Sequence, residues 1–189
     1  MPPSPLRLVV LDARAPGGRS GRAVAEWFRS RARRHPDLEL DVVVLAELDL
    51  PLFLPPAGHP AVAPHAARIG AADAVVVITP EYNQSFPGGL KQAIDVVRGE
   101  WAAKPVAFVT YGGVSGGLRA ADQLRPVFAE LHAVAIRDTV SFVRPWERLR
   151  GDRFEPDPGA DAAAETLLDE LTWWATLLRE ARTGRSAAA

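Results

Sequence analysis

Short, mostly apolar runs constrain the fold of this sequence more than any other feature. Four of them are almost unbroken stretches of valine, leucine, isoleucine and alanine, and a fifth is less continuous. Apolar runs of four to eight residues are typical of strands that are buried on both faces of a sheet. We therefore predict five strands, at residues 6–11, 42–45, 74–78, 106–109 and 139–143.

Segments with helical spacing separate these runs. The clearest is the last, in which Leu167, Leu171, Trp174 and Leu178 fall on one helical face, so this helix should pack against the sheet. Strands that alternate with helices require right-handed crossovers and a parallel sheet. The other helices are expected around residues 24–28, 67–70, 90–97 and 118–131.

A doubly wound α/β sheet of this kind binds its ligands at the carboxyl ends of the strands, near the point where the strand order reverses. The loops at 12–20, 80–87 and 111–117 are therefore the candidate functional segments. We see no internal repeat and no domain boundary, which predicts one domain over residues 1–189 with a frayed tail at 184–189.

Composition excludes several classes of function. The 22 basic and 23 acidic residues give a net charge of −1, so neither nucleic acid nor an anionic membrane is an expected partner. The chain has no cysteine, which excludes disulfides and thiolate chemistry, and its histidines lack ligand spacing, so no metal site is expected. His35, His59, His65 and His132 are interpreted as surface residues.

No apolar run is long enough to span a bilayer, and the first residues lack the layout of a signal peptide. The sequence therefore predicts a cytoplasmic protein.

Two loops on neighbouring predicted strands carry the strongest functional signal. Residues 79–95 follow a strand and open a helix, with Pro87 where the helix should begin. Residues 110–117 contain four glycines, which permit positive φ and close approach of a planar ligand to backbone N–H groups. Each loop alone is equally well explained as a rigid connection, but two on adjacent strands predict the two walls of a flat slot.

These residues resemble a known family. Pro-Glu-Tyr-Asn at 80–83, running into Pro-Gly-x-Leu-Lys-x-Ala-Ile-Asp at 87–95, resembles the NADPH-dependent FMN reductases, which include quinone, azo and chromate reductases. Tyr-Gly-Gly-x-Ser-Gly-Gly at 111–117 is a second shared motif, and the segment 48–53 is also similar. The resemblance covers residues 6–182 and implies a flavodoxin-like fold, a five-stranded parallel sheet of order 2-1-3-4-5 with helices on both faces.

The resemblance also implies a cofactor and its ligands. FMN would be the resident cofactor and NADPH or NADH the co-substrate, with hydride passing through the flavin to a small acceptor such as a quinone, an azo or nitro compound, chromate or free flavin. The flavin would carry this chemistry, so no catalytic side chain is implied. The implied ring contacts are Pro80, Glu81, Tyr82, Asn83, Tyr111, Gly112, Gly113, Val114 and Ser115, and the implied phosphate ligands are Arg14, Arg19 and Ser20.

Asp12 departs from the family pattern, which has a serine in the phosphate loop at this position. One interpretation is that its carboxylate caps the first helix. The other is that it faces the phosphate and repels it, in which case Asp12→Ser would tighten FMN binding and riboflavin would suffer less than FMN from the wild-type aspartate.

Two other functions stay open at this stage. A flavodoxin-type electron carrier is disfavoured because the chain is not strongly acidic and lacks a Thr/Ser-rich phosphate loop. A repurposed or flavin-poor member of the family, acting in a biosynthetic pathway or as a binding protein, is motivated by Asp12 alone. The resemblance, with apolar positions on more than one side of the helix at 87–97, predicts a homodimer or homotetramer.

Overall fold

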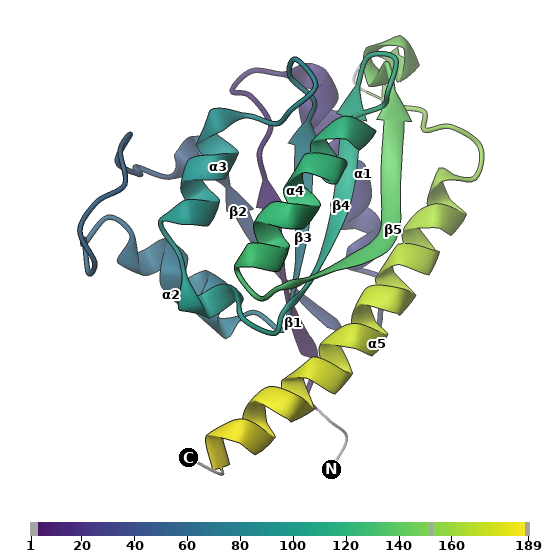
Figure 1. Cartoon of the computed structure of the whole chain (residues 1–189). Helices are drawn as coiled ribbons and strands as arrows, with labels where there is room; N and C mark the ends of the chain where they lie inside the picture. Colours follow the sequence, from purple (N-terminus) through teal and green to yellow (C-terminus); the bar gives the residue numbers. More distant parts are fainter. Residues whose placement is uncertain (1–3, 152, 188–189) are drawn as a thin grey trace.

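In the computed structural model, which describes residues 4–151 and 153–187, a five-stranded parallel sheet has the order β2-β1-β3-β4-β5 (Figure 1). The sheet order and the parallel pairing confirm the sequence prediction. The strands are β1 (Leu6–Asp12), β2 (Leu38–Val44), β3 (Ala74–Pro80), β4 (Pro105–Gly112) and β5 (Val134–Val143). The α-helices are α1 (Arg19–Ala32), α2 (Ala63–Ala71), α3 (Gly88–Asp95), α4 (Leu118–Glu130) and α5 (Ala160–Ala187). Short elements complete the chain: η1 (Leu45–Glu47), η2 (Gly99–Trp101), η3 (Pro145–Arg148) and a hairpin of β6 (Leu149–Arg150) and β7 (Arg153–Phe154).

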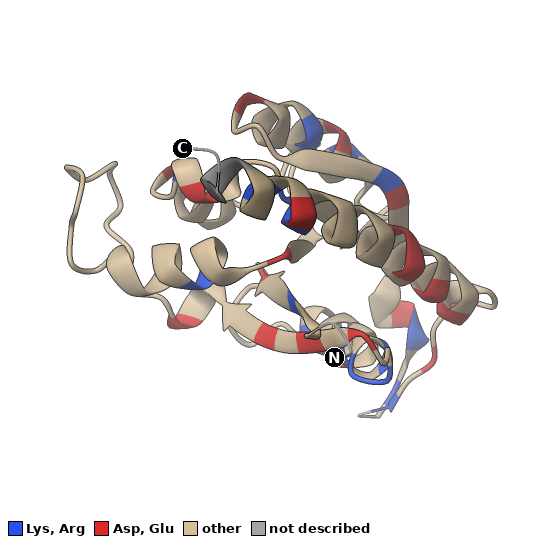
Figure 2. Ribbon diagram, turned by 90° about the horizontal axis from the view of Figure 1, so that it is seen from below, with Lys and Arg blue, Asp and Glu red and all other residues tan. Residues whose placement is uncertain are grey.

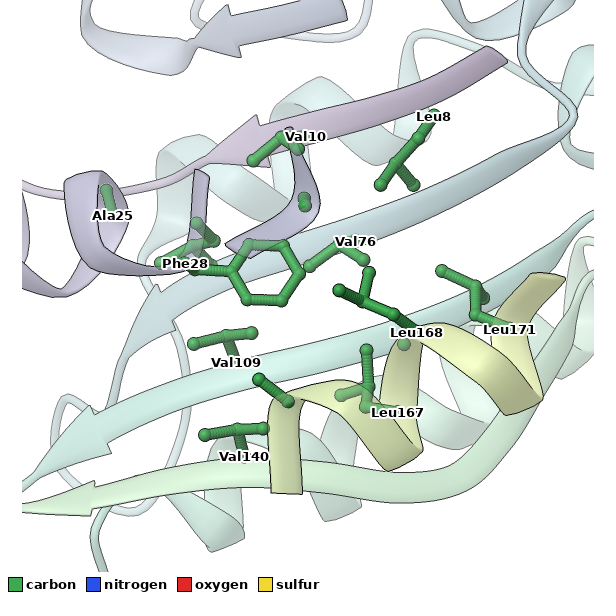
Figure 3. Close-up of a cluster of buried hydrophobic side chains, with 14 of the residues drawn as sticks. Leu8, Val10, Ala25, Phe28, Val76, Val109, Val140, Leu167, Leu168 and Leu171 are labelled. Carbon is green, nitrogen blue, oxygen red and sulfur yellow. The ribbon is translucent and has the colours of Figure 1, made fainter. Parts of the chain in front are cut away.

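Two apolar cores lie on opposite faces of the sheet. One joins the sheet to α1 and α5, and in Figure 3 Phe28 of α1 and Leu167 and Leu171 of α5 lie against the valines of the strands. The other core joins the sheet to α2, α3 and α4 around the fully buried Trp101. All residues of β3 and β4 are buried, because both faces of these central strands are covered. This is why their sequences are continuously apolar.

All five strands are longer than the sequence predicted, and β2 and β5 gain four and five residues at their amino ends. β2 begins at Leu38 because it is the edge strand, where half-exposed positions allow the polar residues Glu39 and Asp41. β5 begins at Val134, and its register against β4 shifts between Val106 and Phe108. Carbonyl groups freed by this irregularity accept hydrogen bonds from Arg125, at 2.6 Å to Ile136 and 3.0 Å to Arg137.

Two other expectations were wrong. α5 continues through Ala187, so most of the segment predicted as a frayed tail is helical, while residues 188 and 189 lie outside the described residues. His65 is not on the surface but 1% exposed, and its Nε2 donates to the carbonyl of Ala93 at 2.9 Å, which joins α2 to α3. Burial lowers the pKa of this imidazole below its ordinary value.

Charged groups gather at the amino ends of the strands, opposite the edge that carries the candidate loops. Asp73 accepts hydrogen bonds from the backbone N–H of Arg7 at 3.0 Å and from Arg182 at 3.1 Å. Figure 2, viewed from below, shows basic and acidic positions interspersed along this edge and along α5. Lys104 is almost fully buried here, and its Nζ donates to the carbonyls of Ile69, Gly70 and Ala72 at 2.6–2.7 Å. It therefore satisfies carbonyl groups at the C-terminal end of α2.

Lys104→Met is expected to lower the free energy of unfolding by about 2 kcal/mol or more, because buried carbonyls lose their donor. Lys91→Met is the matched control, since Lys91 is the only other lysine and pairs with Asp95 at the surface of α3. That change should cost less than about 0.5 kcal/mol. Urea titrations at pH 7 measure both values, and equal losses would contradict the capping role.

The same lysine should give stability a distinctive pH dependence. Burial first, and then the nearby Arg182, lower the pKa of Lys104 to about 8 in the folded protein. An unfolded lysine titrates near 10.4, so between about pH 8 and pH 10.4 the unfolded state binds more protons. The free energy of unfolding therefore gains a rising component with pH in this window, and the component should be absent from Lys104→Met.

Candidate functional site

The carboxyl ends of three adjacent strands bring the candidate loops together. In the register of the sheet Asp12 of β1 is paired with Ile78 of β3, and Pro80 of β3 with Tyr111 of β4. The loops at 13–18, 81–87 and 113–117 therefore leave the sheet side by side, at the edge where the strand arrows end in Figure 1. This is also where the strand order reverses between β1 and β3.

The loop after β3 contains a tight turn. Tyr82 and Ser85 exchange two backbone hydrogen bonds of 2.9 Å, and the residues between them, Asn83 and Gln84, both have positive φ. Positive φ at both central positions is the requirement of a type I′ turn. Gln123 of α4 holds the turn by hydrogen bonds of 2.6 Å to the Ser85 hydroxyl and the Gln84 carbonyl. Tyr82, which is 47% exposed, is thus presented to solvent on a fixed backbone.

The loops after β3 and β4 are joined to each other. The N–H of Glu81 donates to the carbonyl of Tyr111 at 2.9 Å, and the Glu81 carboxylate accepts from the Ser115 hydroxyl and, at 3.4 Å, from Arg119. The two segments therefore form one continuous platform and do not face each other across an open slot. Glu81 and Ser115, both predicted to contact a cofactor, bond to each other in the structure.

The glycines of the second loop have different roles. A Cβ on Gly117, where φ is +92°, would lie 2.7 Å from Thr110 Cβ, and a Cβ on Gly116 would collide with Ser141. A Cβ on Gly112 would lie 3.2 Å from that of Glu81. These glycines allow the loop to pack on the protein itself. Only Gly113 among them faces open space, so it is the position where the backbone can approach a ligand.

Asp12 fits neither sequence interpretation. Its side chain is fully buried on the α1 face of the sheet, the face that Leu8 and Val10 also occupy. Oδ1 accepts the N–H of Arg14 at 3.2 Å, and Oδ2 accepts from the guanidiniums of both Arg14 and Arg29. Asp12 is not a helix cap, because α1 has Gly18 at its N-cap without a side-chain hydrogen bond. Burial raises the pKa of Asp12 and the two arginines oppose that rise.

The other predicted phosphate ligands lie in different places. Arg14 lies in the loop, whereas Arg19 is exposed and donates to the carbonyl of Gly151 at 2.7 Å, in the turn of the β6–β7 hairpin. Ser20 is half-buried in the first turn of α1.

Tyr111, a predicted ring contact, is buried with its hydroxyl against Gly21, where a Cβ would collide with it. Its ring therefore lies under the start of α1 and not on the platform, and burial raises its pKa well above the ordinary value.

A hollow of about 530 Å³ opens beside these loops, and mostly apolar residues line it. Arg14 and Tyr82 are the predicted site residues that reach it, and no described residue of the 111–117 loop does. Sequence reasoning missed the remaining walls, which come from the segment after β2 and the start of α3. The similarity of residues 48–53 to the family was the sequence feature that could have indicated these walls. These walls include Leu45, Leu48, Leu50, Pro51, Leu52, Pro87, Leu90 and Gln92.

The residues present fit an FMN molecule. Within the described ranges, the backbone N–H groups of Asn83, Gly113 and Val114 make no hydrogen bond to protein. At the other loop, the N–H groups of Ser20 and Gly21 lie in the first helical turn, which has no acidic residue and no side-chain cap. Unpaired donors on the platform suit the polar edge of a flavin, and those at the helix N-terminus suit a phosphate.

The described residues contain no group of three or more histidine, aspartate or glutamate side chains placed to hold a metal ion. None of the helices in the described part of the chain is both long and apolar enough to cross a membrane.

Comparison with known proteins shows the family. Residues 6–147 match the family described as NADPH-dependent FMN reductase. The chain is 35% identical over 133 residues to the NAD(P)H-dependent FMN reductase ntnL of Nectria sp, covering 63% of this chain and 64% of that protein. It is 45% identical over 76 residues to a quinone reductase of Escherichia coli, covering 38% of this chain and 40% of that protein. The matches thus span less than two thirds of these relatives.

Solved structures show the same fold. The flavoenzyme NAD(P)H:(acceptor) oxidoreductase FerB from Paracoccus denitrificans superposes with a TM-score of 0.68 at 22% identity, over 92% of this chain and 97% of that one. The fold, the three loops at one edge of the sheet and the matched family residues agree, and the chain belongs to the NADPH-dependent FMN reductase family.

Proposed function

We propose that this protein is an FMN-dependent NAD(P)H oxidoreductase that reduces small acceptors of the quinone type. The observation that carries the proposal is the set of unpaired N–H donors at one sheet edge, in the loops after β3 and β4 and in the first turn of α1, at the positions of the family's motifs. Relatives named FMN reductase and quinone reductase support the reaction class. The flavin-binding unit would be the five-stranded sheet with its helices, one domain over the chain.

Each loop would have a separate part in binding. When bound, FMN supplies the hydride-transfer chemistry between nicotinamide and acceptor. Arg14 and the first-turn N–H groups of Ser20 and Gly21 would hold the phosphate. The N–H groups of Asn83, Gly113 and Val114 would donate to the polar edge of the ring, and charge that develops there would be stabilised by these fixed dipoles. The hydrogen bonds of Glu81 keep the donors in place before any ligand arrives.

The hollow supports an apolar acceptor. Its walls are mainly leucine, proline and alanine, and Tyr82 is the aromatic residue among them. A planar, weakly polar molecule such as a quinone would gain from burial against such a surface, whereas a hydrated oxyanion would not.

The purified protein is expected to bind FMN and to oxidise NADPH or NADH when 1,4-benzoquinone is added. Flavin fluorescence titration and absorbance at the nicotinamide band measure the two steps separately. Binding of FMN without turnover would favour an electron carrier. Failure to bind at tens of micromolar FMN would remove the enzyme proposal and favour a flavin-poor member, with the fold and family unaffected.

Gly113→Val should weaken FMN binding at least about tenfold, because a branched side chain would occupy the space into which the backbone opens. The free energy of unfolding should change by less than about 0.5 kcal/mol, since no atom lies within 4 Å of the added Cβ and φ is not positive. Gly99→Val, equally open but in η2 near the opposite edge, is the control. Unchanged FMN affinity in Gly113→Val would exclude a ring contact at this loop.

We also propose that the protein is a homodimer or homotetramer, as its family resemblance suggests. The apolar side of α3 does not support this, because Leu90, Ala93 and Ile94 are buried within the chain's own core. The support is a different surface: Leu52, Phe53 and Leu54 are 81%, 80% and 53% exposed beside the hollow. Contiguous exposed apolar side chains are typical of contacts between protein subunits.

We also propose a cytoplasmic location, which cell fractionation tests.

Light scattering at micromolar concentration is expected to give at least twice the chain mass of 20.4 kDa. Phe53→Asp should shift the mass toward the monomer, because a charge would be buried in the contact. Trp173→Asp, at a 55% exposed position on α5, is the control and should leave the mass unchanged. A monomeric wild type would refute the proposal.

A further inference from the structure

The buried carboxylate of Asp12 organises the loop that follows it. Asp12 binds Arg14 twice, through the backbone N–H and through the guanidinium, and it binds Arg29 from the far half of α1. Three segments of the chain therefore meet at one carboxyl group. Both arginine side chains are mostly covered, with 16% and 14% exposure, so the arrangement is part of the interior behind the loop.

The charges in this cluster do not balance. Arginine stays protonated in proteins, so two guanidiniums against one carboxylate leave a net charge of +1. Uncompensated charge is costly where water is largely excluded. Arg29 also has a buried Nε with no hydrogen-bond partner in the described residues. A positive excess behind a loop with unpaired N–H groups calls for an anionic ligand in that loop.

The geometry leaves part of Arg14 available. Within the described residues, one nitrogen of its guanidinium bonds to Asp12, and the other two have no hydrogen bond. Arg14 also lines the hollow of about 530 Å³. One nitrogen of the guanidinium is thus held by Asp12, and the side chain keeps 16% exposure through which its remaining donors can meet a ligand in the loop. Planar arginine donors in a fixed orientation suit phosphate oxygens.

We propose that Asp12 is a positioning residue, which holds Arg14 in the orientation that binds a phosphate group and so makes the site select FMN over riboflavin. The proposal rests on the proposed function and names the determinant of its cofactor specificity. It reverses the sequence expectation for Asp12→Ser: the carboxylate lies behind the arginines, so its removal should loosen phosphate binding. The family's serine is replaced by a residue that acts through a neighbour.

The test uses the full chain and three probes, FMN, riboflavin and inorganic phosphate. Arg14→Gln should raise the Kd for FMN about 30-fold and Asp12→Asn about tenfold, as expected for charge-assisted hydrogen bonds that are lost or misaligned. Both variants should change the Kd for riboflavin less than about twofold. In an Arg14→Gln background, Asp12→Asn should have almost no further effect, because Asp12 acts through Arg14.

Asp41→Asn is the matched control. Asp41 also pairs with two arginines, Arg7 and Arg68, but on the edge strand β2 and outside the three loops. This variant should keep all three affinities within about twofold of wild type. Thermal melts of every variant show whether it is folded at the temperature of the titration. If Asp12→Asn is unfolded, the Arg14→Lys variant tests the proposal instead. It keeps the positive charge but loses the planar guanidinium donors that Asp12 orients, so it should bind FMN about tenfold more weakly.

Each other outcome overturns the inference. Tighter FMN binding by Asp12→Asn would mean that the carboxylate repels phosphate, equal losses for FMN and riboflavin would mean a purely structural role, and full affinity in Arg14→Lys would mean that orientation is unimportant. The proposed function fails separately: a protein that binds neither flavin but binds phosphate through Arg14 and Asp12 would refute the proposed function and the selection of FMN, and would keep only the positioning of Arg14 by Asp12. One that does not bind phosphate either would refute both.

Discussion

The burial of the parallel sheet on both faces is the constraint on which the rest of the structure depends. β3 and β4 have no exposed residue, so the chain can place polar groups only where these strands end. Backbone N–H and C=O groups of the central strands are mostly used in strand pairing, and donors without a protein partner occur in the loops beyond the sheet. The functional edge and the apolar core are therefore consequences of one arrangement.

Each edge of the sheet has a carboxylate paired with two arginines, Asp73 at the amino ends and Asp12 at the carboxyl ends, but the second group is the more deeply buried. At the amino ends, Lys104 and Asp73 have hydrogen-bond partners that complete helix and strand termini. At the carboxyl ends, Asp12 and its two arginines leave one positive charge without a counter-charge among them. The first edge is built for stability. The second retains an electrostatic cost that a bound anion would remove, which is the expected compromise at a binding site.

The site illustrates why residue motifs predict location better than role. The loops at 80–87 and 111–117 are adjacent as predicted, because parallel strands end at a common edge. Their contact through Glu81 and Ser115, and the turn of Tyr111 under α1, depend on side-chain packing between elements far apart in the sequence. The glycines of the second loop show the same point, since Gly116 and Gly117 are required by the protein's own backbone and Gly113 is the one with open space.

The sequence by itself determined the five strands of the main sheet, their alternation with helices, the family and the edge that carries the candidate loops, because these follow from hydrophobic periodicity and local motifs. It also contained a clue to Asp12, since Leu8, Val10 and Asp12 alternate onto one face of a buried strand. Only the tertiary structure decided that Arg29, seventeen residues later, meets that carboxylate, that His65 is buried and that the segment after β2 walls the hollow. Such contacts depend on how α1, α2 and the β2 connection pack on the sheet, and no local pattern of residues encodes that packing.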